Sequence, residues 1–487
     1  MSQKLPRQLG LLSLTATGIC SMIGASIYVV PFMVQRHVPG IGPYVWAAFL
    51  LAAVPAVLAA FAYAILASAM PRAGGSYIFA SRGLHPYWGF VASFSQWFGL
   101  CIAIGVVSYV IVPFLRDIAV AAGWQALAAQ LSMPTVRLLL ALALLWTFVA
   151  VNIRGIKAYE KTLLPLMMLM FGLGFIVIII GFYFNSTEFI AALQRSGRAL
   201  PEISAPFSWP VLLSAAAVLF SSFIGFDSIA QAGGEAREPG KLLPRAIALA
   251  VGIVGAFYFL FASAVYHTVP WQFVAAEAQQ TDVTAPGLLA YVVPAGLSVW
   301  IVSGAAVALT NDLPAMLLSV SRLLFAWAAD GVFPAGVAAI HTRYQTPYLA
   351  IVLSGLMATV GIVGCHLAGD FFLGVDVLVI AMLFNFLLMC VTVLAIHRVN
   401  PGLAGDITVI RNRRVQQVVA MAGIVALGLF FVIHVRRDLA SDLPWYFHSS
   451  WMWLLVMFIG SLIFFVKYQK LKQNSKSSEI FTNLPNE

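Results

Sequence analysis

The apolar residues of this chain gather in blocks of about twenty or more, and short stretches rich in Arg, Lys, Asp, Glu and Pro separate the blocks. A block of that length, folded as a helix, spans the hydrocarbon core of a bilayer. A single soluble core would not need this segmentation. Only 9% of the 487 residues are charged, against roughly 25% in an average soluble domain. The sequence therefore predicts an all-α polytopic membrane protein.

Twelve membrane-spanning helices account for the blocks. We place them near residues 9–34, 43–70, 86–113, 132–152, 162–184, 209–234, 243–267, 287–327, 347–367, 371–397, 415–435 and 450–468. The expected organisation is a cytoplasmic N-terminus (1–8), a first five-helix unit (9–184), a second five-helix unit (209–397), helices eleven and twelve (415–468) and a cytoplasmic tail (469–487). The polar stretch from Lys467 onward lacks periodicity, so we expect a mobile end there.

The net charge of +9 could indicate a nucleic-acid partner, so the location of the basic residues has to decide. If the N-terminus is cytoplasmic, 20 of the 27 Lys and Arg residues fall on the cytoplasmic side of the predicted spans. Positive residues are enriched in cytoplasmic loops of membrane proteins. The charge therefore predicts that both termini are cytoplasmic, and it does not indicate nucleic acid.

Several other classes of site find no support in the sequence. The four cysteines (Cys20, Cys101, Cys365 and Cys390) fall inside predicted spans, too widely spaced for a zinc motif and poorly placed for a secreted disulfide framework. The chain has no His–carboxylate metal cluster, no Ser–His or Cys–His signature and no Gly-rich phosphate loop. The first apolar block is too long for a signal-peptide core, so we expect it to stay in the protein. We predict no enzyme activity, no metal and no cofactor.

A short internal echo suggests that the chain contains a repeat. Residues 21–24 read Ser-Met-Ile-Gly, and residues 222–225 read Ser-Phe-Ile-Gly. Four-residue matches also arise by chance in apolar sequence. These two, however, each interrupt an apolar span, the first and the sixth. A unit of five spans has an odd number, so the second unit would run with the opposite orientation, as in inverted-repeat transporters.

The first span is a poor helix interior near its middle. Gly18 and Gly24 lie there among small residues, ahead of Pro31, and glycine costs up to about 1 kcal/mol relative to alanine inside a helix. Unwound backbone at membrane depth is tolerated only where it lines a cavity or packs on protein. Its free amides would suit a carboxylate and its free carbonyls an ammonium group. The alternative is that small residues serve close packing between helices.

The sixth span adds an ionisable residue, Asp227, to the glycine at position 225. A carboxylate at the centre of a spanning helix costs roughly 2.5–3.5 kcal/mol on insertion scales, so such residues usually face the interior and serve transport. The alternative is a protonated carboxyl group that only makes structural hydrogen bonds.

Four blocks of residues resemble the amino acid–polyamine–organocation family of permeases. They cover residues 21–31, 71–77, 225–247 and 321–347, in the family's order. The resemblance implies a LeuT-like five-plus-five inverted-repeat bundle with discontinuous first and sixth helices. It also implies alternating access, with amino acids or amines as cargo.

Carried over position by position, the resemblance assigns backbone groups to the substrate. The amides of Gly24, Ala25 and Ser26 would bind its carboxylate, and the carbonyls of Met22, Ser221 and Ile224 would bind its amine. Where the family usually has a small residue followed by glycine, this chain has Ala25 and Ser26. The carboxylate site would then be tighter, or a hydroxyl would contribute to it.

A second departure from the family concerns coupling. Several proton-coupled members carry a lysine inside span five, where this chain has only residues 167–170, Met-Met-Leu-Met. The protein could be an exchanger or uniporter, or it could use Asp227 for protons. Exchange or proton linkage is the prediction.

Side chains near the two interruptions complete the expected site. Asp312 in span eight would bind the distal ammonium of a cationic amino acid or diamine, because a charge in a low dielectric requires a partner. Its alternative role is to cap a kink at Pro314. Gates that close over the substrate are expected at Trp97, Phe220, Phe223, Phe226 and Met316, although most aromatic rings in such a bundle only pack. The full predicted substrate site is Ser21, Met22, Ile23, Gly24, Ala25, Ser26, Trp97, Cys101, Phe220, Ser221, Phe223, Ile224, Gly225, Asp312 and Met316.

The function predicted from these residues is secondary transport of amino acids or related amines across the inner (plasma) membrane. The partners would be a small-molecule substrate and the lipid bilayer, and a homodimer is compatible with the sequence. Two alternatives remain. An inorganic-ion transporter on the same fold would have more side-chain oxygen in its site, and a nutrient sensor usually has a long cytoplasmic extension.

Overall fold

The computed structural model describes residues 5–281, 283–368, 372–442, 444–473 and 477–485. Within these ranges, twelve helices are long and apolar enough to cross a membrane. This confirms the predicted all-helical, multi-pass architecture. The spans are α1 with α2 (Leu11–Met22, Ala25–His37), α3 (Val45–Ala69), α5 (Pro86–Ala121), α7 (Pro134–Ile153), α8 (Ile156–Tyr183), α10 with η2 and α11 (Trp209–Leu219, Phe220–Phe223, Asp227–Gln231), α12 (Pro239–Thr268), α15 (Ala295–Ala329), α16 (Tyr348–Ala368), α17 (Phe372–Val399), α19 (Arg413–Leu439) and α20 (Ser449–Gln473).

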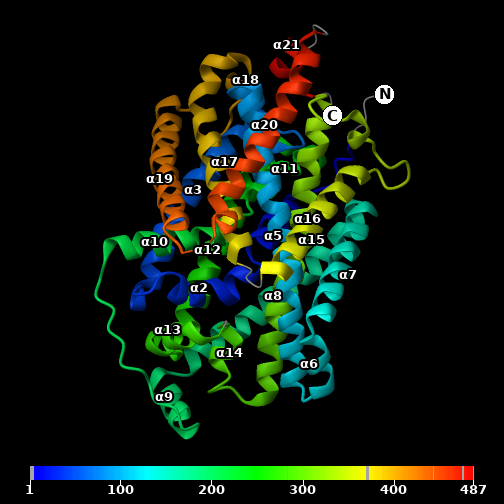
Figure 1. The fold of residues 1–487 in the computed structure, drawn as a ribbon. Helices are drawn as coiled ribbons and strands as arrows, with labels where there is room; N and C mark the ends of the chain where they lie inside the picture. Colours follow the sequence, from blue (N-terminus) through cyan, green and yellow to red (C-terminus); the bar gives the residue numbers. More distant parts are fainter. Residues whose placement is uncertain (1–4, 282, 369–371, 443, 474–476, 486–487) are drawn as a thin grey trace.

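Short helices connect the spans. They are η1 (Gly42–Tyr44), α4 (Gly75–Gly83), α6 (Gln125–Leu131), α9 (Ser186–Arg195), η3 (Gly233–Glu235), α13 (Trp271–Gln280), α14 (Ala285–Leu289), η4 (Ala335–Ala338), α18 (Pro401–Gly405), η5 (Trp445–Phe447) and α21 (Ser477–Thr482). Both described ends of the chain lie at the same end of the bundle, which we call the terminal end (Figure 1). Helices α9 and α13 lie at the opposite end.

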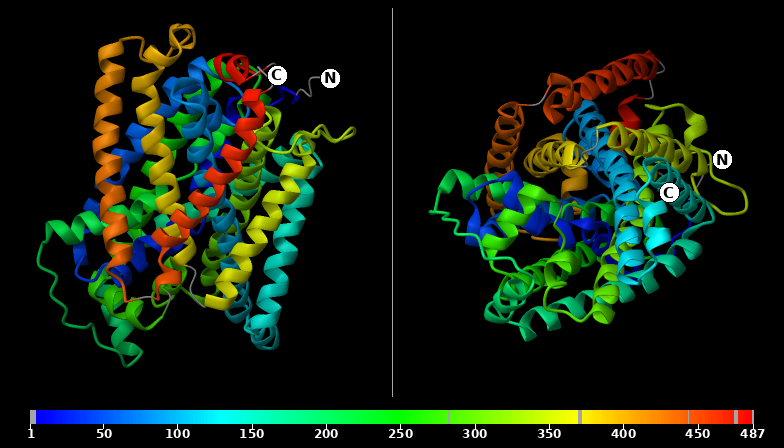
Figure 2. Two further views of the ribbon diagram at one scale, coloured as in Figure 1. Left: turned by 45° about the horizontal axis from the view of Figure 1, so that its top comes forward. Right: turned by 60° about the horizontal axis from the view of Figure 1, so that its bottom comes forward.

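The spans pack as two neighbouring groups. Helix α5 contacts α15, α16 and α17, and α12 contacts α3, α1 and α8. Helices α19 and α20 lie at the edge of the bundle, where both contact α17 (Figure 2). The core is continuous across these contacts, since the buried apolar side chains of the spans form one large cluster.

Two predicted span boundaries are wrong, and prolines are involved in both. The third span does not end near residue 113: Pro113 lies inside α5, which continues to Ala121. One lost hydrogen bond is tolerated in a spanning helix because neighbouring groups compensate for it. The eighth span does not begin near residue 287, because α14 ends at Leu289 and α15 begins at Ala295, after Pro294. Proline favours the start of a helix, where its missing N–H costs nothing.

The tail also differs from the expected mobile end. Helix α20 continues to Gln473, and α21 follows at Ser477–Thr482. Phe481 of α21 is buried and packs against Tyr468. As a single aromatic residue in a polar stretch, Phe481 produces no hydrophobic periodicity. Its ring nevertheless packs against apolar side chains at the terminal end. Residues 474–476 and 486–487 of the predicted tail, and 1–4 of the predicted N-terminus, lie outside the described residues.

Candidate functional site

The first span is divided near its middle. Helix α1 ends at Met22 and α2 begins at Ala25, and the backbone dihedrals of Ile23 and Gly24 are not helical. A helix end leaves carbonyl groups without partners inside the helix. One of them, the carbonyl of Met22, accepts a hydrogen bond from the Tyr258 hydroxyl at 2.9 Å. The side-chain positions of Ala25 and Ser26 lie outside what the structure describes.

The sixth span is divided at the same depth. Helix α10 ends at Leu219 and passes through the short η2 turn. Ile224 is then extended, and Gly225 has a φ of 136° before α11 begins at Asp227. Only glycine adopts such a φ readily. A Cβ atom on Gly225 would also overlap the backbone of Ser21 and Met22. Glycine at this position therefore allows the two interruptions to lie against each other.

A cavity of about 60 Å³ lies beside the two interruptions. Six predicted site residues line it: Ser21, Met22, Ser221, Ile224, Asp312 and Met316. Eight further lining residues were not predicted: Val29, Val30, Ala103, Val106, Val107, Val110, Val375 and Leu378. They are apolar residues of apolar spans, so nothing in the sequence distinguishes them. Small-molecule sites usually measure about 300–1,000 Å³, so the cavity is smaller than a typical ligand site.

Asp312 is the most unusual group in the cavity wall. Its side chain is only 6% exposed, and within the described residues its Oδ1 atom has no hydrogen-bond partner. Its Oδ2 atom lies against Gly24, where a Cβ atom would overlap it. Helix α15 runs through Pro314 without a break. A buried carboxylate oxygen without a partner costs free energy, which a bound cation would recover.

Asn311, the neighbour of Asp312, also has a buried side-chain oxygen without a hydrogen-bond partner among the described residues. The Asn311 side-chain amide donates to the sulfur of Cys20 at 2.9 Å. Its Oδ1 atom, like that of Asp312, has no partner within the described part of the chain. Most buried polar atoms in proteins are hydrogen-bonded. Two adjacent unsatisfied oxygens on one helix therefore indicate a place where a donor is missing.

Asp227 has a different environment. It is fully buried at the start of α11, and its carboxylate accepts hydrogen bonds from the Gln96 side chain and from the backbone N–H of Gly225 at 3.2 Å. Gln96 is bonded in turn to Ser76 and Gln231. This polar network joins α11, α5 and α4. Asp227 is not among the described residues that line the cavity.

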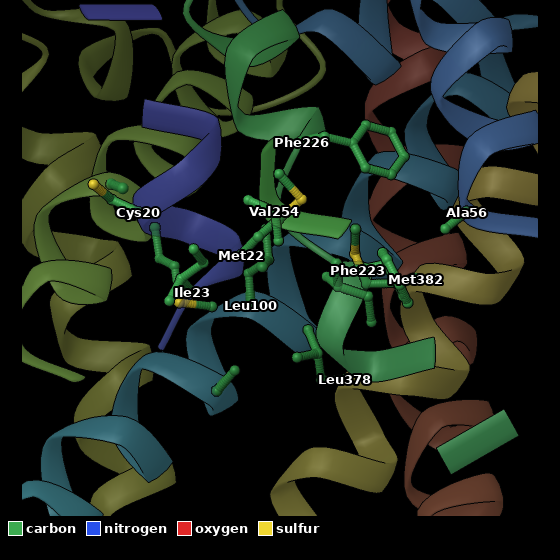
Figure 3. Packing of buried hydrophobic residues seen from close by; sticks show 14 of the residues in the cluster. Cys20, Met22, Ile23, Ala56, Leu100, Phe223, Phe226, Val254, Leu378 and Met382 are labelled. Carbon is green, nitrogen blue, oxygen red and sulfur yellow. The ribbon is translucent and has the colours of Figure 1, made fainter. Parts of the chain in front are cut away.

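The other predicted site residues whose side chains the structure describes are not among the residues that line the cavity. Figure 3 shows Ile23 and Phe223 in the apolar packing beside Met22 and Leu378. Cys101 is fully buried. Gly24 and Gly225 contribute through their backbone, as described above.

The predicted aromatic gates make packing contacts in this conformation. Trp97 donates to Ser354 at 3.2 Å, and Phe220 packs against Phe386. Phe226 stacks on the same Phe386 ring, with centroids 5.0 Å apart. A role in gating would therefore require these rings to move.

Two buried ion pairs lie at the terminal end. Arg322 donates to both carboxylate oxygens of Glu235, at 3.1 and 2.5 Å. Arg82 donates to both oxygens of Asp330, at 2.5 and 2.9 Å. The backbone carbonyl of Glu235 also accepts from the N–H groups of Gln8 and Leu9. Three of these charged residues lie in the blocks that carried the family resemblance, but no local pattern indicates that they pair.

Metal binding finds no support in the described residues, where no three His, Cys, Asp or Glu side chains come together to hold an ion. A family model described as "Amino acid permease" matches residues 9–469. An uncharacterized transporter of Mycobacterium tuberculosis is 29% identical over 373 residues, which cover 74% of this chain and 76% of the relative.

Two relatives have names that state a substrate class. Cationic amino acid transporter 4 of Mus musculus is 28% identical over 371 residues, covering 73% of this chain and 55% of the relative. The branched-chain amino acid permease BcaP of Bacillus subtilis is 24% identical over 485 residues, covering 97% of this chain and 96% of the relative.

Proposed function

This chain belongs to the amino acid permease family, and from that premise we propose that it transports amino acids or related amines by alternating access. The names of two relatives, a cationic amino acid transporter and a branched-chain amino acid permease, support this class of cargo. The carboxylate and backbone carbonyl groups of the candidate site favour a cargo that carries at least one ammonium group.

The observation that carries the proposal is the unpartnered carboxylate of Asp312 beside two interrupted spans. An ammonium group within hydrogen-bond distance of Oδ1 would satisfy the buried charge. The carbonyls of Met22, Ser221 and Ile224 would bind a second amine proton or an α-amino group. The amides that begin α2, from Gly24 to residue 26, would bind a carboxylate at a helix N-terminus.

The interruptions also support the inverted-repeat fold. Under this proposal, residues 9–184 and 209–397 are two units of five spans, each with its first span divided. Contact between Gly225 and the backbone of Ser21 places the two divisions together, as expected where binding sites form at a repeat interface. Helices α19 and α20 then lie outside the repeat.

We place the terminal end in the cytoplasm and the protein in the plasma membrane of a bacterial-type cell. The excess of Lys and Arg on that side supports the orientation. With the ion pairs Arg322–Glu235 and Arg82–Asp330 formed, access from that end is closed. Transport then requires these contacts to separate in one half of the cycle.

Coupling is proposed to be exchange or proton linkage, with Asp227 as the proton-carrying group. The hydrogen-bond partners of Asp227 are neutral, a side-chain amide and a backbone N–H. A carboxyl group in such a setting can bind and release a proton without breaking an ion pair. Its position at the start of α11, two residues after Gly225, would link protonation to the geometry of the divided span.

The experiment that tests the proposal is counterflow in liposomes. Purified protein is reconstituted with an unlabelled amino acid or amine inside, and a trace of the radiolabelled compound is added outside. We expect time-dependent accumulation of label for at least one compound of a broad panel. Protein-free liposomes are the control. A sensor would bind ligand without accumulation, and an ion carrier would move neither class of organic solute, so either result would refute transport.

A further inference from the structure

A second cavity, of about 610 Å³, lies at the end of the bundle opposite the termini. It is formed where the beginning of α3 and the end of α12 meet α9 and the start of α13 (Figure 1). Its volume is in the range of small-molecule and cofactor sites. None of its described lining residues belongs to the predicted substrate site: they are Pro43, Val45, Trp46, Phe49, Ser186, Ile190, Leu200, Phe259, Ala262, Ser263, Tyr266, His267, Pro270, Trp271 and Gln272.

The wall of this cavity suits an uncharged, apolar occupant. Its described residues include no Asp, Glu, Lys or Arg, and aromatic rings make up much of it. A zwitterionic or cationic solute would lose its hydration there without gaining a charged partner. The polar groups gather at the loop end, where Ser186, His267 and Gln272 lie.

Large apolar side chains that line the cavity are exposed on its two spanning helices. Trp46 on α3 is 55% exposed and Phe259 on α12 is 43% exposed. Large apolar side chains exposed on a membrane-spanning helix contact lipid. An apolar cavity that opens between two such helices is open to hydrocarbon chains and remote from the substrate path. We propose that it binds an acyl chain of a phospholipid in that leaflet, with the lipid's polar region near Gln272.

Two lining residues connect this site to the divided spans. Phe49 packs against Tyr258, with ring centroids 5.9 Å apart, and Tyr258 donates to the Met22 carbonyl. Tyr266 donates through its hydroxyl to the carbonyl of Pro31 in α2 at 2.9 Å. An acyl chain packed against Phe49 and Tyr266 would support the rings that position α2 and the first interruption.

The test is photo-cross-linking with a phospholipid that carries a diazirine near the end of one acyl chain. The full-length protein is reconstituted with this lipid, irradiated and mapped by mass spectrometry. We expect adducts concentrated in residues 43–49 and 259–272. Labelling spread evenly over the exposed faces of α3, α7, α12 and α19, or no labelling at the cavity, would overturn the proposal. This map of the unmodified protein is decisive by itself.

A matched pair of variants gives a second readout. Ser263→Phe puts a ring into the cavity wall, and we expect it to reduce the cavity adducts at least about 10-fold relative to adducts elsewhere. Ala256→Phe puts the same ring on the same face of α12, about two turns away and outside the cavity. It should leave the adduct map unchanged. Equal adduct yields in the two variants would contradict a cavity-specific site.

An independent observation concerns the C-terminal segment at the other end of the molecule. Figure 1 shows α21 packed at the terminal end, beyond α20. Phe481 is 8% exposed, and its ring centroid lies 5.5 Å from the Arg82 guanidinium carbon. The Asn400 side chain donates to the carbonyl of Thr482 at 2.9 Å. The segment thus contacts both α4 and the end of α17.

Arginine side chains hold the rest of the segment. Arg82, which pairs with Asp330, also donates to the carbonyl of Asn483 at 3.4 Å. Arg72 donates to the carbonyl of Pro485 at 3.0 Å. The backbone next to Arg72 pairs with the end of the sixth span, since Ala73 forms a bridge with Ala232. The C-terminal segment therefore binds two arginines that lie at the closed terminal end.

We infer that residues 480–485 are a strap that stabilises the conformation closed at the terminal end. This inference rests on the proposed function, because opening at that end is a step of the transport cycle. Release of the strap would remove its contacts with Arg72 and Arg82 and lower the cost of separating α4 from α11. The strap would then set how often the site opens to the terminal side.

The test compares Phe481→Ala with Asn483→Ala. The first removes the ring that packs on Arg82, whereas the Asn483 side chain is exposed and its contact is made by the backbone carbonyl. The readout is maleimide labelling of Cys20, a buried residue of α1, followed by mass spectrometry of its peptide. We expect labelling roughly 5-fold faster in Phe481→Ala, from the loss of about 1 kcal/mol of ring–guanidinium contact. Asn483→Ala should label at the unmodified rate.

A labelling rate of Cys20 that is unchanged in Phe481→Ala would overturn the strap. Size-exclusion profiles of the two variants show whether the protein stays folded. Because labelling reports opening and not transport, it distinguishes failure of the strap from failure of the proposed function: a strap without transport would still accelerate labelling.

Discussion

Replacing Asp312 by Asn tests whether its unpartnered carboxylate binds a cation. The substitution keeps the shape of the side chain and removes its charge. Because Oδ1 has no partner among the described residues, the substitution breaks no hydrogen bond of that atom in the ligand-free protein. Its effect on binding therefore reports the interaction with the ligand.

Because Asp312 is buried, Asp312→Asn should have opposite effects on two free energies: it weakens ligand binding, and it does not destabilise the ligand-free protein. A hydrogen bond to a charged partner contributes about 1.5–3 kcal/mol, so Asp312→Asn should weaken binding of a cationic amino acid or diamine roughly 10- to 150-fold. Removing an unsatisfied buried charge relieves a penalty on the order of 1 kcal/mol. The ligand-free variant should therefore unfold at the same temperature as the unmodified protein or higher.

A thermal-shift titration measures both quantities in one experiment. Ligand stabilisation follows affinity through mass action, so the titration gives the dissociation constants of cationic and neutral ligands. Asp117→Asn is the matched control, because Asp117 is an exposed partner of Arg116 that is not among the lining residues of the cavity, and exposed pairs contribute little. Equal loss of affinity for cationic and neutral ligands, or a large drop in the unfolding temperature of the ligand-free variant, would show that Asp312 is structural.

Three further predictions concern the rest of the site. Gly225→Ala should lower the unfolding temperature and abolish counterflow, because Cβ would overlap the backbone of the first interruption. Its control, Gly252→Ala, has a Cβ that meets nothing within 4 Å and should stabilise α12 by about 0.5–1 kcal/mol. Similar unfolding temperatures for the two variants would contradict close packing at Gly225. Arg322→Ala should destabilise the protein by about 3–5 kcal/mol, since it leaves Glu235 buried and unpaired, and denaturant unfolding that shows less than 1 kcal/mol would refute this. Asp227→Asn keeps only one of the two acceptor oxygens that bond Gln96 and Gly225, so it should lower the unfolding temperature and lose any response of uptake to an imposed proton gradient, and an unchanged response would exclude Asp227 as the proton carrier.

The membrane-spanning architecture was predictable from the sequence because each span meets the same solvent, the hydrocarbon core, along most of its length. Weak points at Gly24 and Gly225 were also predictable, because glycine disfavours a helix interior. Boundaries set by a single turn were not. Pro113 ends no helix, whereas α15 begins directly after Pro294, and the local sequence does not distinguish these two situations.

Residues of the candidate site could be predicted where their charge is energetically costly in an apolar span. They could not be predicted where they are apolar residues like their neighbours. Asp312 stands out in an apolar helix, and the structure places it in the cavity wall. Val29, Val106 and Val375 line the same cavity but resemble every other valine in the spans. The contact of Phe481 with Arg82 joins residues from opposite ends of the chain, and no local pattern encodes it.

A structure of the protein with a transported amine bound is the most direct test of whether Asp312 binds the ammonium group of the cargo. We expect the ligand to lie between the two divided spans, with its ammonium nitrogen within about 3 Å of Asp312 Oδ1. Its remaining polar groups should bond to the backbone near residues 22–26 and 221–225. The cavity should be larger than the present 60 Å³. A ligand bound elsewhere, with the Asp312 carboxylate still unpartnered, would contradict the proposal that Asp312 binds the ammonium group of the cargo.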